Sequence, residues 1–164
     1  MSNLADKLSD VLMAFMRYYN VTTEDVLPPF KAYAEFASHN EQYFLVKAAK
    51  VADIDSNEYV YFATEEVLTK DLVTSLADKA WNDGLSKVVP SYGHRNSDVT
   101  VIIISEKIEE EAVKTIKKLK LYKSYKHTFY GWSHFKLIAM DLSSKRLAFN
   151  RQGQSYKKVL NNRF

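Results

Sequence analysis

The sequence predicts an α+β fold in which helices pack on a largely antiparallel mixed sheet, in the order αβββαβαβββα. Apolar residues recur every three to four positions in some segments and every second position in others. Runs of the second kind are separated by single segments of the first, which is typical of α+β domains. The chain has 164 residues, 46% of them hydrophobic, with only four Gly and three Pro. We therefore expect one globular domain over residues 1–164.

The N-terminal third is predicted to form one helix and three strands. The apolar residues of the helix recur at the spacing of a single helical face. They are Leu4, Leu8, Val11, Leu12 and Phe15. Pro28 and Pro29 prevent this helix from continuing through residues 28–29. The three strands are expected at residues 30–38, 41–54 and 58–63, joined as an antiparallel meander.

A second helix is predicted over residues 69–83, followed by a buried strand. Thr69 is its expected N-cap and Gly84 the left-handed residue that ends it. Residues 99–105 are mostly apolar and β-branched, which predicts a central strand buried on both faces. Ser105 is expected to cap the third helix.

The remainder returns to strands and ends in a short helix. Strands are predicted between residues 123 and 150, with breaks at Gly131 and at residues 143–144. The last helix is expected over residues 150–160, with Asn150 as its cap.

The composition limits the chemistry and favours the cytoplasm. There is no cysteine, so disulfides, thiol nucleophiles and Cys-ligated metals are excluded. The N-terminal residues lack the pattern of a signal peptide, and the apolar runs are too short to span a bilayer. We expect a cytoplasmic protein without a membrane partner.

Charge is distributed very unevenly along the chain. Residues 1–119 contain 13 Lys/Arg and 19 Asp/Glu, a net charge of −6, whereas residues 120–164 contain 10 Lys/Arg and Asp141 alone, a net charge of +9. Basic residues with interspersed aromatics are typical of nucleic-acid-binding surfaces. A match between the two halves, within one chain or across a dimer, is the alternative. The candidate binding residues are Lys145, Arg146, Arg151, Lys157, Lys158, Arg163, Tyr125 and Trp132.

The sequence offers no catalytic or cofactor-binding motif. Gly-rich phosphate-binding patterns and paired histidine motifs are missing from the sequence. His127 and His134 flank the expected bend at Gly131, and with Asp141 they are the one metal-site candidate; the alternative is ordinary turn and surface histidines. We predict no cofactor and no metal.

The α-β-β-β-α-β part of the predicted order resembles the core of the PD-(D/E)xK nucleases. That family implies an acidic residue on its second strand and Glu-x-Lys on its third, which hold a metal ion. Asp53 and Asp55 match the first requirement, but the third strand reads Glu58-Tyr59-Val60, with valine at the lysine position. A metal-dependent nuclease is therefore the third-ranked interpretation.

A second resemblance rests on three short motifs in the C-terminal part. They are Gly131-Trp132, Asp141-Leu142 and Asn150-Arg151-Gln152-Gly153. In these the chain resembles an uncharacterised bacterial family. The resemblance implies a bacterial cytoplasmic protein and no particular activity.

These observations favour a non-catalytic intracellular protein-interaction domain that self-associates. Opposite charges in the two halves and abundant Tyr suit protein interfaces. The alternative is a nucleic-acid-binding protein that uses the basic residues 120–164. In both interpretations the chain is a binding protein rather than an enzyme.

Overall fold

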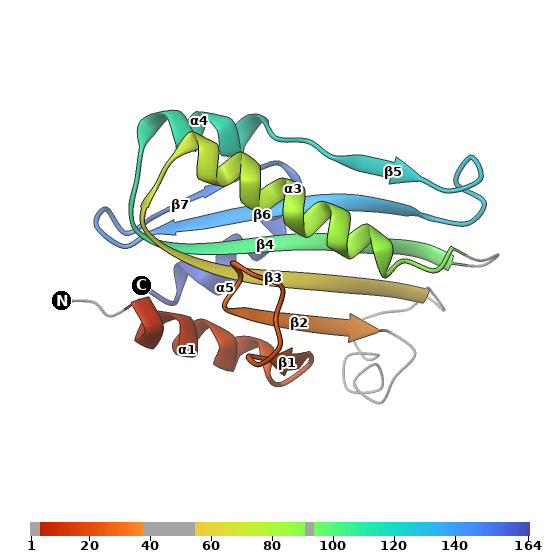
Figure 1. Ribbon diagram of the computed structural model, residues 1–164, viewed down its shortest axis with the longest axis horizontal. Helices are drawn as coiled ribbons and strands as arrows, with labels where there is room; N and C mark the ends of the chain where they lie inside the picture. The colour runs from red at the N-terminus through yellow and green to blue at the C-terminus, as the bar shows by residue number, and fades with distance from the viewer. Residues whose placement is uncertain (1–3, 38–54, 91–93) are drawn as a thin grey trace.

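A seven-stranded mixed sheet forms the centre of the protein (Figure 1). The structure is a computed structural model and describes residues 4–37, 55–90 and 94–164. The strand order is β1-β2-β3-β4-β6-β5, and β7 also pairs with β6. The strands are β1 (Asn20–Thr22), β2 (Ala32–Ala37), β3 (Asp55–Leu68), β4 (His94–Ile108), β5 (Tyr122–Ser124), β6 (Trp132–Asp141) and β7 (Arg146–Phe149).

Helices cover both faces of the sheet. The helices are α1 (Leu4–Phe15), α3 (Lys70–Ser86), α4 (Glu110–Lys118), the 3-10 helix η2 (Gln152–Tyr156) and α5 (Lys157–Asn161). Figure 1 shows α3 and α4 on one face and α5 behind the other. Two separate apolar cores result, one beneath α3 and α4 and one shared by α1, η2 and α5. No helix among the described residues is long and apolar enough to cross a membrane.

The three central strands β3, β4 and β6 run parallel to one another, while β1–β2, β2–β3, β5–β6 and β6–β7 are antiparallel. Alternate residues of a strand point to opposite faces, and both faces are covered here. For this reason Val101 and Ile103 of β4 enter the α3–α4 core, while Ile102 and Ile104 enter the other. The predicted strand at residues 99–105 is confirmed as the buried centre.

The predicted α+β class and the element order αβββαβαβββα are confirmed. One strand of the order is supplied by a segment that the pattern did not indicate. The short edge strand β1 begins the meander, whereas the predicted strand at residues 41–54 lies outside the described residues. Three residues are too few to show a period, which explains why β1 was not recognisable.

Of the predicted boundaries of α3 and α4, two are wrong and one is confirmed. Thr69 caps α3, because its hydroxyl accepts a hydrogen bond from the N–H of Leu72 at 3.2 Å. Gly84 does not end this helix but lies buried within it, where an added Cβ would approach a methyl group of Val99 to 2.5 Å. The glycine permits close packing of α3 on β4. Ser105 belongs to β4, and Glu109 occupies the N-cap position of α4.

Asn150 supplies hydrogen bonds to the part of β6 that neither β5 nor β7 pairs with. β5 pairs with residues 132–134 and β7 with residues 138–141. Between them, the Asn150 amide donates to the carbonyl of Phe135 at 2.9 Å and accepts from the N–H of Leu137 at 3.0 Å. Its oxygen also accepts from the N–H of Gly153 at 2.8 Å, and its nitrogen donates to the carbonyl of Leu119. The predicted cap position is one residue too early, because Arg151 occupies the N-cap position of η2.

The motif Asn150-Arg151-Gln152-Gly153 therefore has a structural cause. A Cβ on Gly153 would lie 2.4 Å from the carbonyl oxygen of Leu137, so no larger residue fits beside the strand. Asn150 is buried and forms hydrogen bonds with both its amide donor and its amide acceptor, which is the normal condition of a buried polar group.

We predict that Asn150→Ala lowers the free energy of unfolding by about 3 kcal/mol, because buried backbone groups of β6 lose their partners. Urea denaturation followed by circular dichroism measures this change. Asn161→Ala, on the exposed side of α5, is the control and is expected to be nearly neutral. Equal stabilities of the two variants would contradict the role of Asn150.

Candidate functional site

A cluster of polar side chains is buried on the sheet face that carries the α1–α5 core. Toward their C-terminal ends, β3, β4 and β6 present apolar residues to this face. Toward their N-terminal ends the same faces are polar, and the register places Glu58 beside Asp98 and Thr100 beside Lys136. We call this group the Glu58 cluster. Its members are Tyr19, Glu58, Asp98, Thr100, Lys136 and Tyr156.

Glu58 lies at the centre of the cluster. Its Oε2 accepts hydrogen bonds from the hydroxyls of Thr100 and Tyr156, each at 2.6 Å. The hydroxyl of Tyr19 donates to Oε1. Tyr19 precedes β1 and Tyr156 ends η2. One carboxylate of β3 thereby binds three separate segments of the chain to each other.

Lys136 lies between two carboxylates. Its Nζ is 3.3 Å from Oδ2 of Asp98 and 3.6 Å from Oε2 of Glu58. It also lies over the ring of Tyr156, 5.7 Å from the centroid. Asp98 in turn accepts from the backbone N–H of His134 at 3.3 Å. The start of β6 is therefore held to β4 by side chains as well as by the backbone ladder.

The charges of the cluster stabilise each other. Burial alone would raise the pKa of Glu58, but the Lys136 ammonium and the hydroxyl donors outweigh it, and the pKa is lowered. Burial alone would lower the pKa of Lys136, but the carboxylates of Glu58 and Asp98 outweigh it, and the pKa is raised. Burial and the charge of Glu58 raise the pKa of Tyr19 and of Tyr156, so both phenols stay protonated.

This arrangement suits a structural role better than acid–base catalysis. A general base needs a pKa near the working pH and a lone pair that faces a substrate. Both oxygens of Glu58 already accept hydrogen bonds, and its pKa is shifted away from neutrality. Breaking a buried pair of this kind is costly because the remaining charge loses its partner.

We predict that Glu58→Gln lowers the free energy of unfolding by about 3 kcal/mol at neutral pH. The lowered pKa of Glu58 stabilises the fold above the unfolded value of about 4.3, and this contribution is lost as the pH falls through the folded value. The difference between wild type and variant should therefore shrink in acid. Urea denaturation over a pH series measures it.

The control for this series is Glu66→Gln, which removes an exposed carboxyl from the same strand. It should change stability little at any pH. If Glu58→Gln and Glu66→Gln gave the same pH profile, Glu58 would not act as a buried anion.

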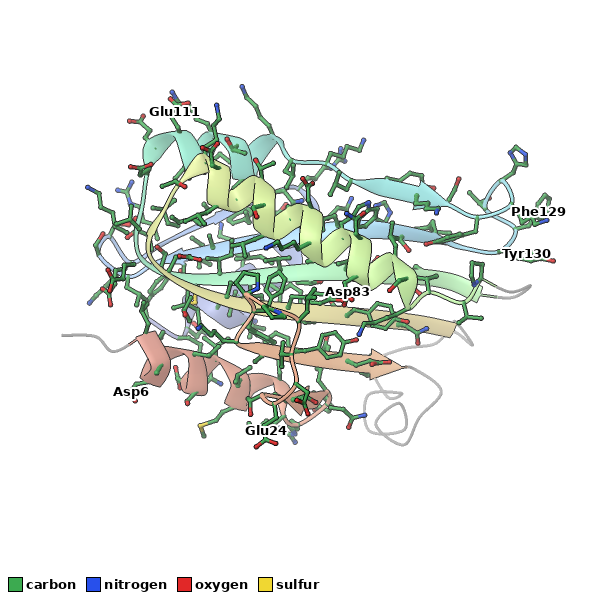
Figure 2. The ribbon with its side chains drawn as sticks, in the orientation of Figure 1. Asp6, Glu24, Asp83, Glu111, Phe129 and Tyr130 are labelled. Carbon is green, nitrogen blue, oxygen red and sulfur yellow. The ribbon has the colours of Figure 1, made fainter. Side chains whose placement is uncertain are left out.

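A second feature is an exposed edge of the molecule that is rich in lysine and aromatic residues. It runs from the C-terminal end of α4 along β5 to the turn between β5 and β6. Figure 2 shows Phe129 and Tyr130 at the far end of this hairpin, well away from Glu111 on α4. We call it the lysine–aromatic edge. Its members are Lys117, Lys118, Lys120, Tyr122, Lys123, Tyr125, Lys126, Phe129 and Tyr130.

The turn between β5 and β6 has an unusual backbone conformation that exposes its side chains. Lys126, His127 and Thr128 have φ values of 50°, 53° and 75°, and Gly131 has 94°. Three consecutive non-glycine residues in the left-handed region are strained, above all the β-branched Thr128. Backbone hydrogen bonds between Tyr125 and Gly131 at 2.9 Å and between Tyr130 and Tyr125 at 3.1 Å close the loop. Phe129 is left 70% exposed.

The structure separates the binding residues predicted from the sequence. Tyr125 and the half-buried Trp132 lie at the hairpin end of β6. Lys145 and Arg146 lie at the other end of that strand, about 30 Å away at the rise of an extended chain. Arg151 is exposed directly before η2, and Lys157 and Lys158 are exposed on α5. Arg163 pairs with Asp10 at 3.0 Å, an internal match between the basic and acidic halves.

Sequence reasoning missed most of the lysine–aromatic edge, although a signal was present. Every residue from 112 to 140 is uncharged or basic, and Lys117, Lys118, Lys120, Lys123 and Lys126 all fall in this stretch. It also missed the Glu58 cluster. The signal for the Glu58 cluster was the presence of polar residues in β3, β4 and β6 on a sheet face that is otherwise apolar.

The two histidines do not form a pair across the bend. His127 lies in the turn, beyond the last β5–β6 register pair. His134 pairs in register with Tyr122, and the two rings lie 5.1 Å apart. Asp141 is at the opposite end of β6. In the described ranges, no group of three His, Cys, Asp or Glu side chains could hold a metal ion.

The resemblance to the PD-(D/E)xK nucleases extends to the element order and not to their motif. The order α1, β1, β2, β3, α3, β4 is present. Val60, at the lysine position, is fully buried in the apolar core. Both carboxylate oxygens of Glu58 already accept hydrogen bonds from other members of the Glu58 cluster. Asp53 and the side chain of Asp55 lie outside the described part of the chain.

The comparisons with known proteins identify a family without an assigned activity. A family model described as a domain of unknown function, DUF8052, matches residues 4–162. No curated protein and no solved structure matches the chain. The expected relationship to an uncharacterised family is thus confirmed, and the geometry alone carries any functional argument.

Proposed function

The chain belongs to the DUF8052 family, whose description assigns no function, and we propose that it binds single-stranded nucleic acid, without catalysis, along the lysine–aromatic edge. The observation that carries this proposal is the coincidence of exposed aromatic rings and unpaired lysines on one acid-free edge.

The lysines of the edge are available to phosphates. Lys117, Lys118, Lys120, Lys123 and Lys126 are all exposed, and none forms a salt bridge with a residue that the structure describes. By contrast, Lys114 one turn earlier is paired with Glu111 at 3.4 Å. Lysines without carboxylate partners release counterions from a nucleic-acid backbone when they bind it, which favours association at low salt.

The aromatic rings supply surfaces on which bases can stack. Tyr122 is 48% exposed and Phe129 70% exposed. The ammonium groups of Lys123 and Lys126 lie near the rings of Tyr125 and Tyr130, at 5.5 Å and 5.8 Å from their centroids. The partly exposed rings of Tyr125 and Tyr130 therefore each have a cation beside them, while Tyr122 and Phe129 offer the most accessible surface. Stacking of a base on such a ring contributes about 1–3 kcal/mol.

A single strand fits this edge better than a duplex. Bases inside a duplex already stack on each other, so exposed rings gain little from them. The edge presents a short strand and a projecting turn, rather than a helix that could enter a major groove. A flexible strand can follow the edge and place unpaired bases on Tyr122 and Phe129.

The test is the salt dependence of binding to a labelled oligothymidylate, measured by fluorescence anisotropy. We expect the affinity to fall with salt by roughly 0.7 log units per phosphate contacted for each tenfold rise in salt. Replacing Lys120, Lys123 and Lys126 together with Gln should lower the slope by about 2. Phe129→Ala should weaken binding and leave the slope unchanged, because it removes stacking and no charge.

A matched control replaces Lys145, Arg146 and Lys157 with Gln. It removes the same charge from residues outside the lysine–aromatic edge and should leave the slope nearly unchanged. Loss of binding in this control alone would assign the nucleic acid to the C-terminal residues instead. Absence of binding by the wild type at low salt would refute the proposal.

A second candidate is the self-associating protein-interaction domain expected from the composition. The observation that favours it is the polarity of α4, which begins with Glu110 and Glu111 and ends with Lys117 and Lys118. A second copy, placed head to tail, would bring acidic and basic ends together, and the outer edge of β5 would lie between them. Sedimentation velocity at low and high salt tests it: a mass that rises with concentration only at low salt is expected, and a monomer throughout would exclude it.

Both functions are proposed for a bacterial cytoplasmic setting. The absence of cysteine from the sequence supports the cytoplasm because secreted proteins often contain disulfides. Fractionation of cells that express a tagged chain tests the location.

A further inference from the structure

We propose that a cleft between α3 and the β1–β2 connection binds a small organic cation, an amine or a quaternary ammonium group. Figure 1 shows that this connection crosses the sheet on the same side as α3. The cleft has a volume of about 320 Å³, which is at the small end of the range for ligand pockets. It lies on the sheet face opposite the Glu58 cluster and is independent of the function proposed for the lysine–aromatic edge.

Aromatic rings form the floor of the cleft. Tyr33 of β2 and Tyr61 of β3 are register partners, and their rings meet edge to face with centroids 5.1 Å apart. Tyr33 is half-buried and offers the face of its ring, while Tyr61 is almost fully buried and donates its hydroxyl to Asp83 at 2.5 Å. Val26 and Leu27 of the connection add apolar contacts at the wall.

Carboxylates surround these rings. Asp83 of α3 and Asp25 of the connection both line the cleft, and Glu35 accepts the hydroxyl of Tyr33 at 3.1 Å. Lys87 is the one base among the lining residues. The face of a tyrosine ring attracts cations through its quadrupole, and nearby carboxylates strengthen this attraction. The cleft is therefore suited to a positively charged ligand.

The protein's own lysine already shows where such a cation binds. Nζ of Lys87 lies 4.3 Å from the centroid of the Tyr33 ring and 3.6 Å from Oδ2 of Asp83. Contact with a ring face and a carboxylate together is the recognition pattern of ammonium ligands. The lysine is weakly held, because its side chain is 37% exposed and an ion pair of that exposure contributes little. A ligand ammonium can replace it while Lys87 moves into solvent.

This geometry makes an unusual prediction for Lys87. If the lysine only helped to form the pocket, its removal would weaken binding. If it occupies the ligand's position, Lys87→Ala frees the site and strengthens binding, by roughly two- to fivefold for one exposed cation–ring contact. Asp83→Asn keeps an acceptor for Tyr61 and removes the charge, so it should weaken binding by a similar factor.

The experiment is a titration of the full chain with choline, followed by amide chemical shifts, beside its uncharged isostere 3,3-dimethylbutan-1-ol. We expect saturable shifts that centre on Tyr33 and Asp83 with choline and none with the alcohol. Tyr33→Leu should abolish them, with a thermal melt to confirm folding, while Phe129→Ala serves as the unaffected control. Equal binding of the alcohol, no saturable shift with choline, or weaker binding by Lys87→Ala would each overturn the proposal.

Discussion

The buried carboxylate of Glu58 is the contact on which the arrangement of the chain depends. A strand that is covered on both faces normally carries apolar residues throughout, yet β3 places a charge against the α1–α5 core. The charge is compatible with burial because Lys136 and the hydroxyls of Thr100, Tyr19 and Tyr156 approach it. These partners come from separate segments of the chain, so the carboxylate fixes the segment after α1 and the C-terminal helices on one sheet.

The same interactions determine how the lysine–aromatic edge is presented. Lys136 and the N–H of His134 are held by Asp98, on the side of β6 that faces β4. Asn150 holds Phe135 and Leu137 on the other side. The residues that follow the hairpin are therefore fixed from both directions, and the strained turn at residues 126–128 projects from a rigid base. These contacts favour binding along β5 and its hairpin, because groups that are already held in place lose less conformational entropy when they bind a ligand.

The sequence allowed the fold to be predicted further than the sites. The class and the element order follow from periodicity, because that signal is local, and Thr69 was recognisable as a cap from its neighbours alone. Gly84 shows the limit: as a helix terminator it was a sound local inference, but its packing against Val99 depends on a strand that comes later in the chain. The Glu58 cluster joins residues up to 137 positions apart, the separation of Tyr19 and Tyr156, which no local pattern indicates. The basic residues 145–163 were correctly counted as an excess of charge, whereas the distance that separates Lys145 and Arg146 from Tyr125 and Trp132 could be seen only from the strand register.

We propose that the lysine–aromatic edge, fixed by buried polar contacts, is the surface on which this chain binds a single strand. Hydrogen–deuterium exchange of the wild-type chain with and without an oligothymidylate tests it most directly. The account predicts slower exchange at residues 120–131 when the oligonucleotide is present, with no change on α5. Protection confined to α5 and the turn at residues 143–146, with none along β5 and its hairpin, would contradict it.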